Sequence, residues 1–100
     1  MVIEHVEIRI LPGRQAEFEE AITRALRTVT ARAQGMHGYV LRRSIEFADR
    51  YVMEVQWETV EHHTVIYKGG PLTHEFRAIV SHLFAEPPVV QHLDLVVEGK

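Results

Sequence analysis

The chain begins with VIEHVEIRILPG, residues 2–13, in which apolar and polar residues alternate until a proline and a glycine end the pattern. One face of this segment carries Val2, Val6, Ile8 and Ile10, and the other carries His5, Glu7 and Arg9. A period of two is typical of a strand with one buried and one polar face. The stretch therefore predicts a first strand, over residues 2–11, that packs on a core through one face only.

The segments that follow extend this pattern into a regular order of helices and strands. From Arg14 to about Ala33, apolar residues recur every three or four positions, as in an amphipathic helix. Further patterns predict strands over Tyr39–Phe47, Tyr51–Trp57 and Val89–Val97, and helices over Val60–Lys68 and Pro71–Phe84. The order βαββαβ predicts an α+β, ferredoxin-like fold with a four-stranded antiparallel sheet. We expect one domain over residues 1–100.

Composition limits the classes of function. The 100 residues include 11 basic and 14 acidic side chains, a formal net charge of -3 with no run of one sign, which argues against a nucleic-acid partner. No apolar stretch approaches the roughly 20 residues that span a bilayer. We expect no signal peptide and no membrane partner, and hence a cytoplasmic protein. The absence of cysteine excludes disulfides, thiolate metal ligands and a cysteine nucleophile.

One face of the predicted sheet is mixed in character. In this order of elements the helices cover one face, and the other carries charges of both signs with valines between them: His5, Glu7, Arg9, Val40, Arg42, Glu54, Gln56, Val90, His92, Asp94 and Val96. This face is either solvated or covered by the sheet of a second copy, with charges paired across a two-fold axis. We favour the homodimer, because a lone chain of this size buries a modest fraction of its surface.

Several motifs resemble those of the antibiotic biosynthesis monooxygenase family. They are Ile10-Leu11-Pro12-Gly13 before Phe18-Glu19, Glu54-Val55-Gln56-Trp57-Glu58, His62-His63 in the short helix, and Gly70-Pro71 before Phe76-Arg77. The resemblance covers nearly the whole chain. It implies a dimeric α/β barrel with a pocket between helices and sheet in each subunit. The family includes cofactor-independent oxygenases of aromatic polyketides and quinols, haem-degrading oxygenases and isomerase-like members.

Three residues near the middle of the chain are the main candidates for a site. Trp57 ends the apolar face of the third strand, where it is either a core aromatic or, as in the family's oxygenases, part of a pocket wall. His63 and Tyr67 are four residues apart on the next helix, so both point towards the sheet. A lone inward histidine is either a hydrogen-bonded core residue or a general base. We predict a catalytic role for His63 and substrate binding by Trp57 and Tyr67.

The remaining candidates are on the last helix and the mixed face. His74 follows Gly69-Gly70-Pro71, a flexible segment that could serve as a lid, and is the second candidate for a catalytic base. Phe76 is a further candidate for substrate binding. His5 and His92 are expected at the dimer contact. No His-x-His, His-x-x-x-His or His-Glu-x-x-His spacing occurs, so we expect no metal site.

The chain contains no asparagine. The resemblance implies that haem-degrading and aromatic-polyketide members use an Asn near their Trp, whereas the residue four positions before Trp57 is Met53. Two function classes therefore stay open. The first is a cofactor-independent monooxygenase that oxidises a small electron-rich aromatic ligand, a quinol, phenol or polyketide-like compound, with dioxygen and a histidine base. The second is a non-oxygenase that binds or isomerises a small molecule on the same fold.

Overall fold

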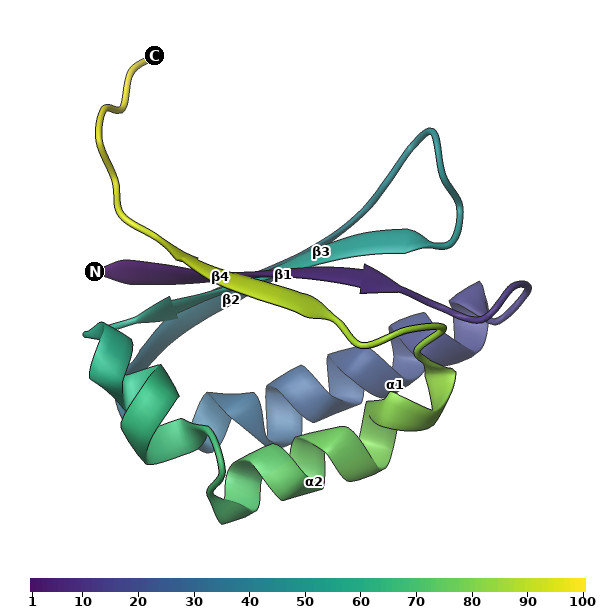
Figure 1. The fold of residues 1–100 in the computed structure, drawn as a ribbon, viewed down its shortest axis with the longest axis horizontal. Helices are drawn as coiled ribbons and strands as arrows, with labels where there is room; N and C mark the ends of the chain where they lie inside the picture. Colours follow the sequence, from purple (N-terminus) through teal and green to yellow (C-terminus); the bar gives the residue numbers. More distant parts are fainter.

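The four strands form one antiparallel sheet, and both long helices cover the same face of it (Figure 1). The structure is a computed structural model that describes residues 1–100. Its elements are β1 (Val2–Arg9), α1 (Gln15–Thr28), β2 (Met36–Arg43), β3 (Arg50–Trp57), the π-helix η2 (His62–Tyr67), α2 (Pro71–Val80) and β4 (Val89–Leu93), with the 3₁₀ turns η1 (Thr30–Arg32) and η3 (Ser81–Leu83). The sheet order β2-β3-β1-β4 confirms the predicted ferredoxin-like fold.

The core lies between the helices and the inward face of the two central strands. β1 and β3 pair with Val6 opposite Met53, and both side chains are buried. They meet the apolar stripe of α1, where Phe18 and Ile22 have no exposed surface. The inward side chains of β1 and the apolar stripe of α1 thus pack against each other in one apolar layer. None of the helices has both the length and the apolar character that a bilayer crossing requires.

The structure shortens three of the predicted strands. β1 ends at Arg9 rather than at Leu11, and Ile10 makes only an isolated bridge with Phe84. β2 covers 36–43 rather than 39–47, because the alternation continues into the β2–β3 hairpin loop, where Ile45 is 95% exposed. β4 ends at Leu93, four residues earlier than predicted. Leu93 pairs with Ile3 of β1, so the chain beyond it runs past the start of β1 and has no strand to pair with. The alternating pattern marks residues able to form a strand, and the available partners set where the strand ends.

One prediction about the faces of the sheet is wrong. β4 pairs with β1 so that His92 lies opposite Glu4 and Val90 lies opposite Val6. Residues directly opposite in an antiparallel pair share a face. Because Val6 is a core residue, Val90 and His92 lie on the helix side of the sheet rather than on the open face. The segment 89–97 has apolar residues in both alternating sets, so its sequence does not define which set points inward.

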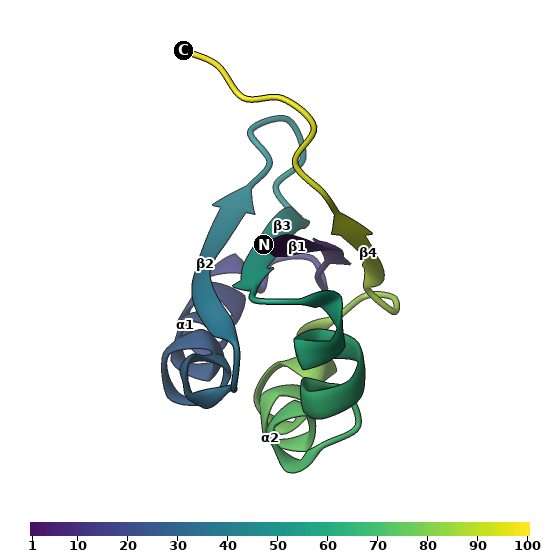
Figure 2. The same ribbon diagram turned by 90° about the vertical axis from the view of Figure 1, so that its left-hand side faces the viewer.

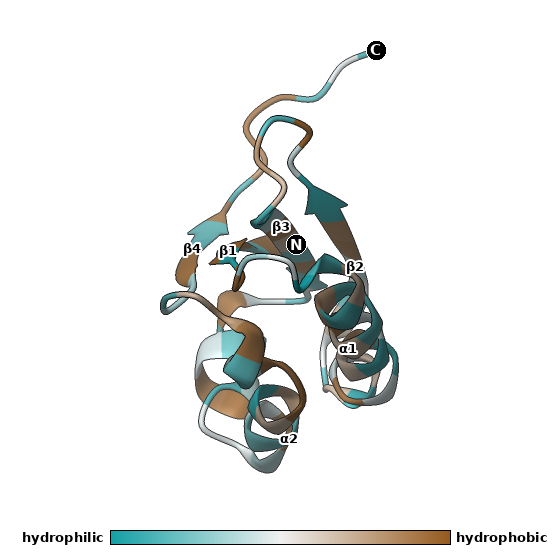
Figure 3. Cartoon of the chain, turned by 90° about the vertical axis from the view of Figure 1, so that its right-hand side faces the viewer, coloured by the Kyte–Doolittle hydropathy of each residue, from teal (hydrophilic) through white to brown (hydrophobic).

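The face of the sheet opposite the helices is uncovered in the single chain. His5 Nδ1 lies 2.7 Å from Glu54 Oε2, and Arg42 Nη1 lies 3.5 Å from the other oxygen of that carboxylate. The hairpin loop 44–49 and the tail 94–100 project on this side, away from the helices (Figures 1 and 2). Figure 3 shows apolar stretches in both. Their exposed apolar residues are Ile45, Phe47, Leu95, Val96 and Val97.

Gly35 is required by the turn that leads into β2. Its φ of +82° lies in the left-handed region, and a Cβ at this position would overlap the side chain of His62. Gly13 has a similar φ of +78° but open space around it. We expect Gly35→Ala to lower the free energy of unfolding by about 3 kcal/mol and Gly13→Ala by about 1 kcal/mol, since only the first adds overlap to backbone strain. Urea unfolding measures both, and equal losses would contradict the packing argument.

Candidate active site

A cavity of about 480 Å³ opens between the inward face of the sheet and the helix α2. Its lining combines residues of β1, β3, η2, α2 and β4. The apolar lining residues are Val6, Met53, Phe76, Phe84, Pro87, Pro88 and Val90, and the polar ones are Glu4, His63, Tyr67, Lys68, Thr73, Arg77 and Ser81. Apolar and polar residues line the cavity in equal number, but most of the lining surface is apolar. A cavity of this volume with a mostly apolar surface is typical of sites for small organic ligands.

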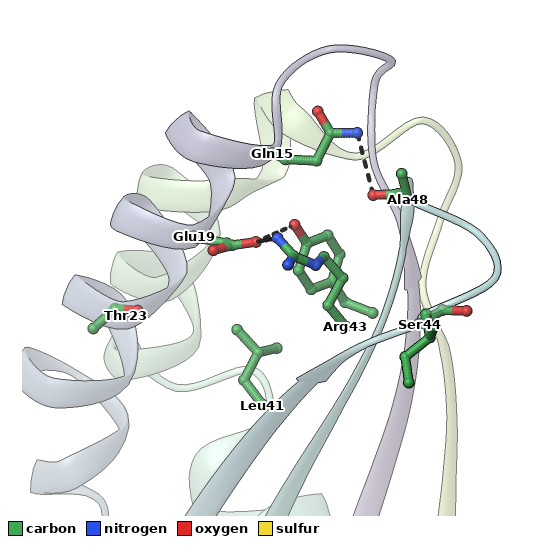
Figure 4. A pocket seen from close by; sticks show the side chains of 9 residues that line it. Gln15, Glu19, Thr23, Leu41, Arg43, Ser44 and Ala48 are labelled. Atoms are coloured by element: carbon green, nitrogen blue, oxygen red, sulfur yellow. Dashed lines mark hydrogen bonds and ion pairs between the residues drawn. The ribbon is translucent and has the colours of Figure 1, made fainter.

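A second hollow, of about 650 Å³, lies between α1 and the β2–β3 hairpin (Figure 4). Its polar groups bind one another: Glu19 Oε2 accepts hydrogen bonds from the Tyr51 hydroxyl at 2.7 Å and from Arg43 Nη1 at 2.8 Å. Burial and the Glu19 carboxylate raise the pKa of Tyr51 to about 12, which keeps the phenol protonated as a donor. Since these groups already satisfy each other, we place the candidate site in the first cavity.

Glu4 is a buried carboxyl group in that cavity. It lies on the inward face of β1, only 6% exposed, and its Oε1 accepts a hydrogen bond of 2.9 Å from Trp57 Nε1. Burial raises the pKa of Glu4, while the Trp57 hydrogen bond and the charge of Lys68 act in the opposite direction. Desolvation is the largest of these effects, so Glu4 holds a proton more strongly than an exposed glutamate does.

His63 packs against both Glu4 and Trp57. The Lys68 amide donates to the His63 carbonyl oxygen at 2.7 Å, the five-residue step of a π-helix. The imidazole stacks on the indole of Trp57, with ring centroids 5.5 Å apart and planes inclined by 25°. Its Nε2 lies 3.4 Å from Glu4 Oε2. Burial, His92 and Lys68 lower the pKa of His63 to about 4, so the ring is neutral at neutral pH.

His92 and Tyr67 complete the cluster. His92 Nε2 lies 2.9 Å from His63 Nδ1, so one of the two rings donates a hydrogen bond to the other. The Tyr67 ring lies 5.2 Å from that of Trp57, and its hydroxyl is 3.3 Å from Thr30 Oγ1. Burial raises the pKa of Tyr67. The polar groups therefore form a continuous chain of contacts from the core to β4, the edge strand of the sheet.

The structure brings most of the predicted site residues together. Trp57, His63 and Tyr67 pack on one another, and Phe76 lines the same cavity from α2. His74 is exposed on α2 and does not line this cavity. The cluster was predictable in part because a four-residue spacing places two rings on one helical face and Trp57 ends the strand immediately before.

Glu4 and the role of His92 were missed in the sequence. Glu4 belongs to the same alternating set as Val6 and Ile8, and a charged residue in an otherwise inward set was the available signal. His92 gave no comparable signal, because the inward face of β4 is fixed only by its register with β1. No buried side-chain nitrogen or oxygen lacks a hydrogen-bond partner, and no group of three or more histidine or acidic side chains is arranged to hold a metal ion.

The fold and the cavity define a small α+β protein with a candidate ligand site between its sheet and its helix α2. The family model for antibiotic biosynthesis monooxygenase matches residues 1–78. This chain belongs to that family. It is also 32% identical over 95 residues to the uncharacterised protein YczJ of Bacillus subtilis, a match that covers 92% of this chain and 96% of the relative.

Solved structures share the fold over nearly the whole chain. A Bordetella bronchiseptica protein assigned to the family is 41% identical and superimposes with a TM-score of 0.90, covering 96% of this chain and 97% of that protein. A variant of SnoaB, a cofactor-independent oxygenase from Streptomyces nogalater, is 18% identical with a TM-score of 0.79, covering 97% and 95%. At that identity the second likeness supports the fold alone.

The low pKa of His63 makes the stability of the fold depend on pH. The pKa is 6.5 for an ordinary histidine and about 4 in the folded protein. Between these two pH values the histidine of the unfolded chain binds a proton that the folded chain does not bind. The stabilisation that the neutral, buried His63 gives to the folded state above pH 6.5 is therefore lost as the pH falls towards 4. We expect His63 by itself to account for a loss of about 3 kcal/mol in the free energy of unfolding, measured by urea unfolding at successive pH values as the difference between wild type and a variant without this histidine.

Two variants test the origin of this loss. His63→Gln is expected to remove most of it, and His74→Gln, at an exposed position on α2, is expected to keep it. The raised pKa of Glu4 has the opposite effect on stability. Its contribution to the free energy of unfolding is present below pH 4.5 and is lost as the pH rises. The difference between wild type and His63→Gln isolates the histidine, and a difference independent of pH would show that another group is responsible.

Proposed function

We propose that this protein is a cofactor-independent monooxygenase that oxidises a small electron-rich aromatic compound, such as a quinol or phenol, with dioxygen. The observation that carries the proposal is a cavity with aromatic and aliphatic walls that also contains the buried Glu4–His63 pair. The family supplies the reaction class, and the cavity supplies a proton acceptor whose side chain is buried.

Without a cofactor, the substrate itself must reduce dioxygen. Removal of a proton turns a phenol into a delocalised anion, which can pass an electron to dioxygen. One oxygen atom then enters the substrate, and the other leaves as water with the two hydrogen atoms that the substrate loses. Such an anion needs a proton acceptor and nearby positive charge. Lys68 and Arg77, which line the same cavity, supply cations.

The aromatic residues of the site would hold the ring of the substrate. Phe76 and Tyr67 line the cavity, and Trp57 lies behind His63 and fixes the imidazole by stacking. Offset or tilted aromatic contacts of this kind stabilise a bound ring by about 1 kcal/mol each beyond its burial. We assign substrate binding to Phe76 and Tyr67. Trp57 has no exposed surface and does not line the cavity, so its part is to position His63.

A non-oxygenase role, in which the cavity binds or isomerises a small molecule, is the second candidate. It is favoured by one observation: the chain has no asparagine, and the residue four positions before Trp57 is Met53, which lines the cavity with an apolar side chain. A ligand-dependent rise in melting temperature without oxygen consumption would support this role over the first.

The monooxygenase proposal predicts that the protein consumes oxygen with quinols or anthrones and forms the oxygenated product. Loss of the histidine in His63→Ala is expected to lower kcat by about 100-fold, the usual contribution of a proton-transfer group. His74→Ala, on the exposed side of α2, serves as the control and is expected to retain activity. An oxygen electrode and product analysis measure both. Equal rates in wild type and His63→Ala would remove His63 from the reaction.

We also propose that the protein is a homodimer in which the open faces of two sheets meet. That face carries paired charges and partly exposed apolar side chains, among them Val40, Val89 and Leu93. The apolar parts of the hairpin loop and of the tail project on the same side (Figure 3). Covering these groups with a second copy removes apolar surface from water, at roughly 25 cal/mol per Å².

Light scattering tests the dimer. The wild-type protein is expected to have twice the chain mass of 11.5 kDa. Val40→Lys places a charge on the open face opposite Glu54, which a single subunit tolerates, and is expected to give a monomer. Val65→Lys, at an exposed valine of η2, is the matched control and is expected to remain dimeric. A wild-type mass of 11.5 kDa would contradict the proposal.

A further inference from the structure

His63 is poorly placed to take a proton from a substrate by itself. Its Nδ1 is hydrogen-bonded with His92 Nε2 at 2.9 Å, and its Nε2 faces Glu4 Oε2 at 3.4 Å. A neutral imidazole has one donor and one acceptor nitrogen, so the partners occupy both. Glu4 differs in this respect. A carboxylate has about four lone-pair sites, and Glu4 uses one for the hydrogen bond from Trp57 and faces His63 with another. The remaining sites are available to a ligand in the cavity that Glu4 lines.

We propose that Glu4 receives the proton from the substrate hydroxyl, and that His63 and His92 pass it to the edge of the sheet. The inference rests on the proposed function, because it assigns the proton acceptor of that reaction. It makes Glu4 a catalytic residue in contact with substrate and makes His63 and His92 a relay rather than an isolated base.

Proton transfer along the relay takes place in two steps. First, the O–H bond of the substrate breaks and its proton binds the Glu4 carboxylate, which leaves the negative charge on the substrate oxygen. Second, the carboxyl proton moves to Nε2 of His63 while the proton on His63 Nδ1 moves to Nε2 of His92. Glu4 is then a carboxylate again, His63 carries its hydrogen on Nε2, and His92 releases a proton to water from β4, where it is half-buried on the edge strand. After the product leaves, proton exchange with water in the cavity returns the hydrogen of His63 to Nδ1 and so resets the relay.

The charges around the relay are consistent with proton transfer from Glu4 through His63 to His92. His63 stays neutral in both steps, as its burial and its pKa of about 4 require. The groups that face Glu4 and His63 are Tyr67 and Lys68 at the end of η2, Arg77 of α2 and His92 of β4. Lys68 favours the ionised form of Glu4 and opposes a charge on His63. The Nε2–Oε2 distance of 3.4 Å must shorten by a few tenths of an ångström for transfer, and such contacts commonly tighten when substrate binds.

The first test needs no substrate. Nitrogen-15 NMR of labelled histidine shows which ring nitrogen carries hydrogen, and the fluorescence of Trp57, the one tryptophan, follows the ionisation of Glu4. As Glu4 loses its proton, the hydrogen of His63 is expected to move from Nδ1 to Nε2 while the ring stays neutral. Glu4→Gln should abolish this change, and Glu7→Gln, on the opposite face of β1, should preserve it. A wild-type His63 whose hydrogen stays on one nitrogen throughout would overturn the relay.

The second test uses 4-nitrophenol, whose absorbance distinguishes phenol from phenolate. In the wild-type cavity the bound compound is expected to be largely phenolate, and in Glu4→Gln its phenolate fraction should fall about tenfold. Removal of a negative charge would by itself raise the phenolate fraction, so a fall identifies a lost proton acceptor. An equal or higher phenolate fraction in Glu4→Gln would overturn the first step.

The two proposals fail in different ways. Absence of oxygen consumption with every quinol and anthrone, together with the expected NMR and absorbance changes, would reject the monooxygenase function and keep the relay. Oxygen consumption at the wild-type rate in Glu4→Gln would reject the relay and keep the function. If both hold, kcat of Glu4→Gln falls about 100-fold, with partial recovery in Glu4→Asp and no change in Glu7→Gln.

Discussion

The hydrogen bond from Trp57 Nε1 to Glu4 Oε1 holds the polar cluster in place. It joins the two central strands beneath the helices, and both side chains are almost excluded from solvent. A buried carboxylate without partners costs several kcal/mol, so the contact removes a large penalty from the folded state. The rings of His63 and Tyr67 then pack on the same indole. The geometry of the cavity therefore depends on one polar contact inside an apolar core.

The π-helix is the second structural feature on which the cluster depends. The predicted α-helix over Val60–Lys68 is replaced by η2, in which each turn contains one more residue. This wider turn brings His63 onto Glu4 and leaves Tyr67 against Trp57 and Thr30. π-Helical turns are uncommon and are frequent at functional sites. Here the irregular turn and the buried carboxyl occur at the same place, which strengthens the assignment of the cavity.

Much of the fold could be predicted from the sequence, because the residues that form it repeat with the period of their element. The stripe through Phe18 and Ile22 and the alternation from Val6 to Ile10 each need only local information. The predictions that were wrong concern features that depend on a partner strand. The end of β4 and the inward position of His92 follow from the register with β1, which no local pattern contains.

The same distinction explains which site residues could be found. His63 and Tyr67 are four residues apart, so local geometry brings them together, and Trp57 precedes them directly. Glu4 is 53 residues from Trp57 and meets it only because β1 and β3 pair. A buried ionisable group with a raised pKa is costly to keep, and the core would accept an apolar residue there at lower cost. Its presence at the wall of a cavity, beside a neutral histidine, is most simply explained by proton transfer in that cavity.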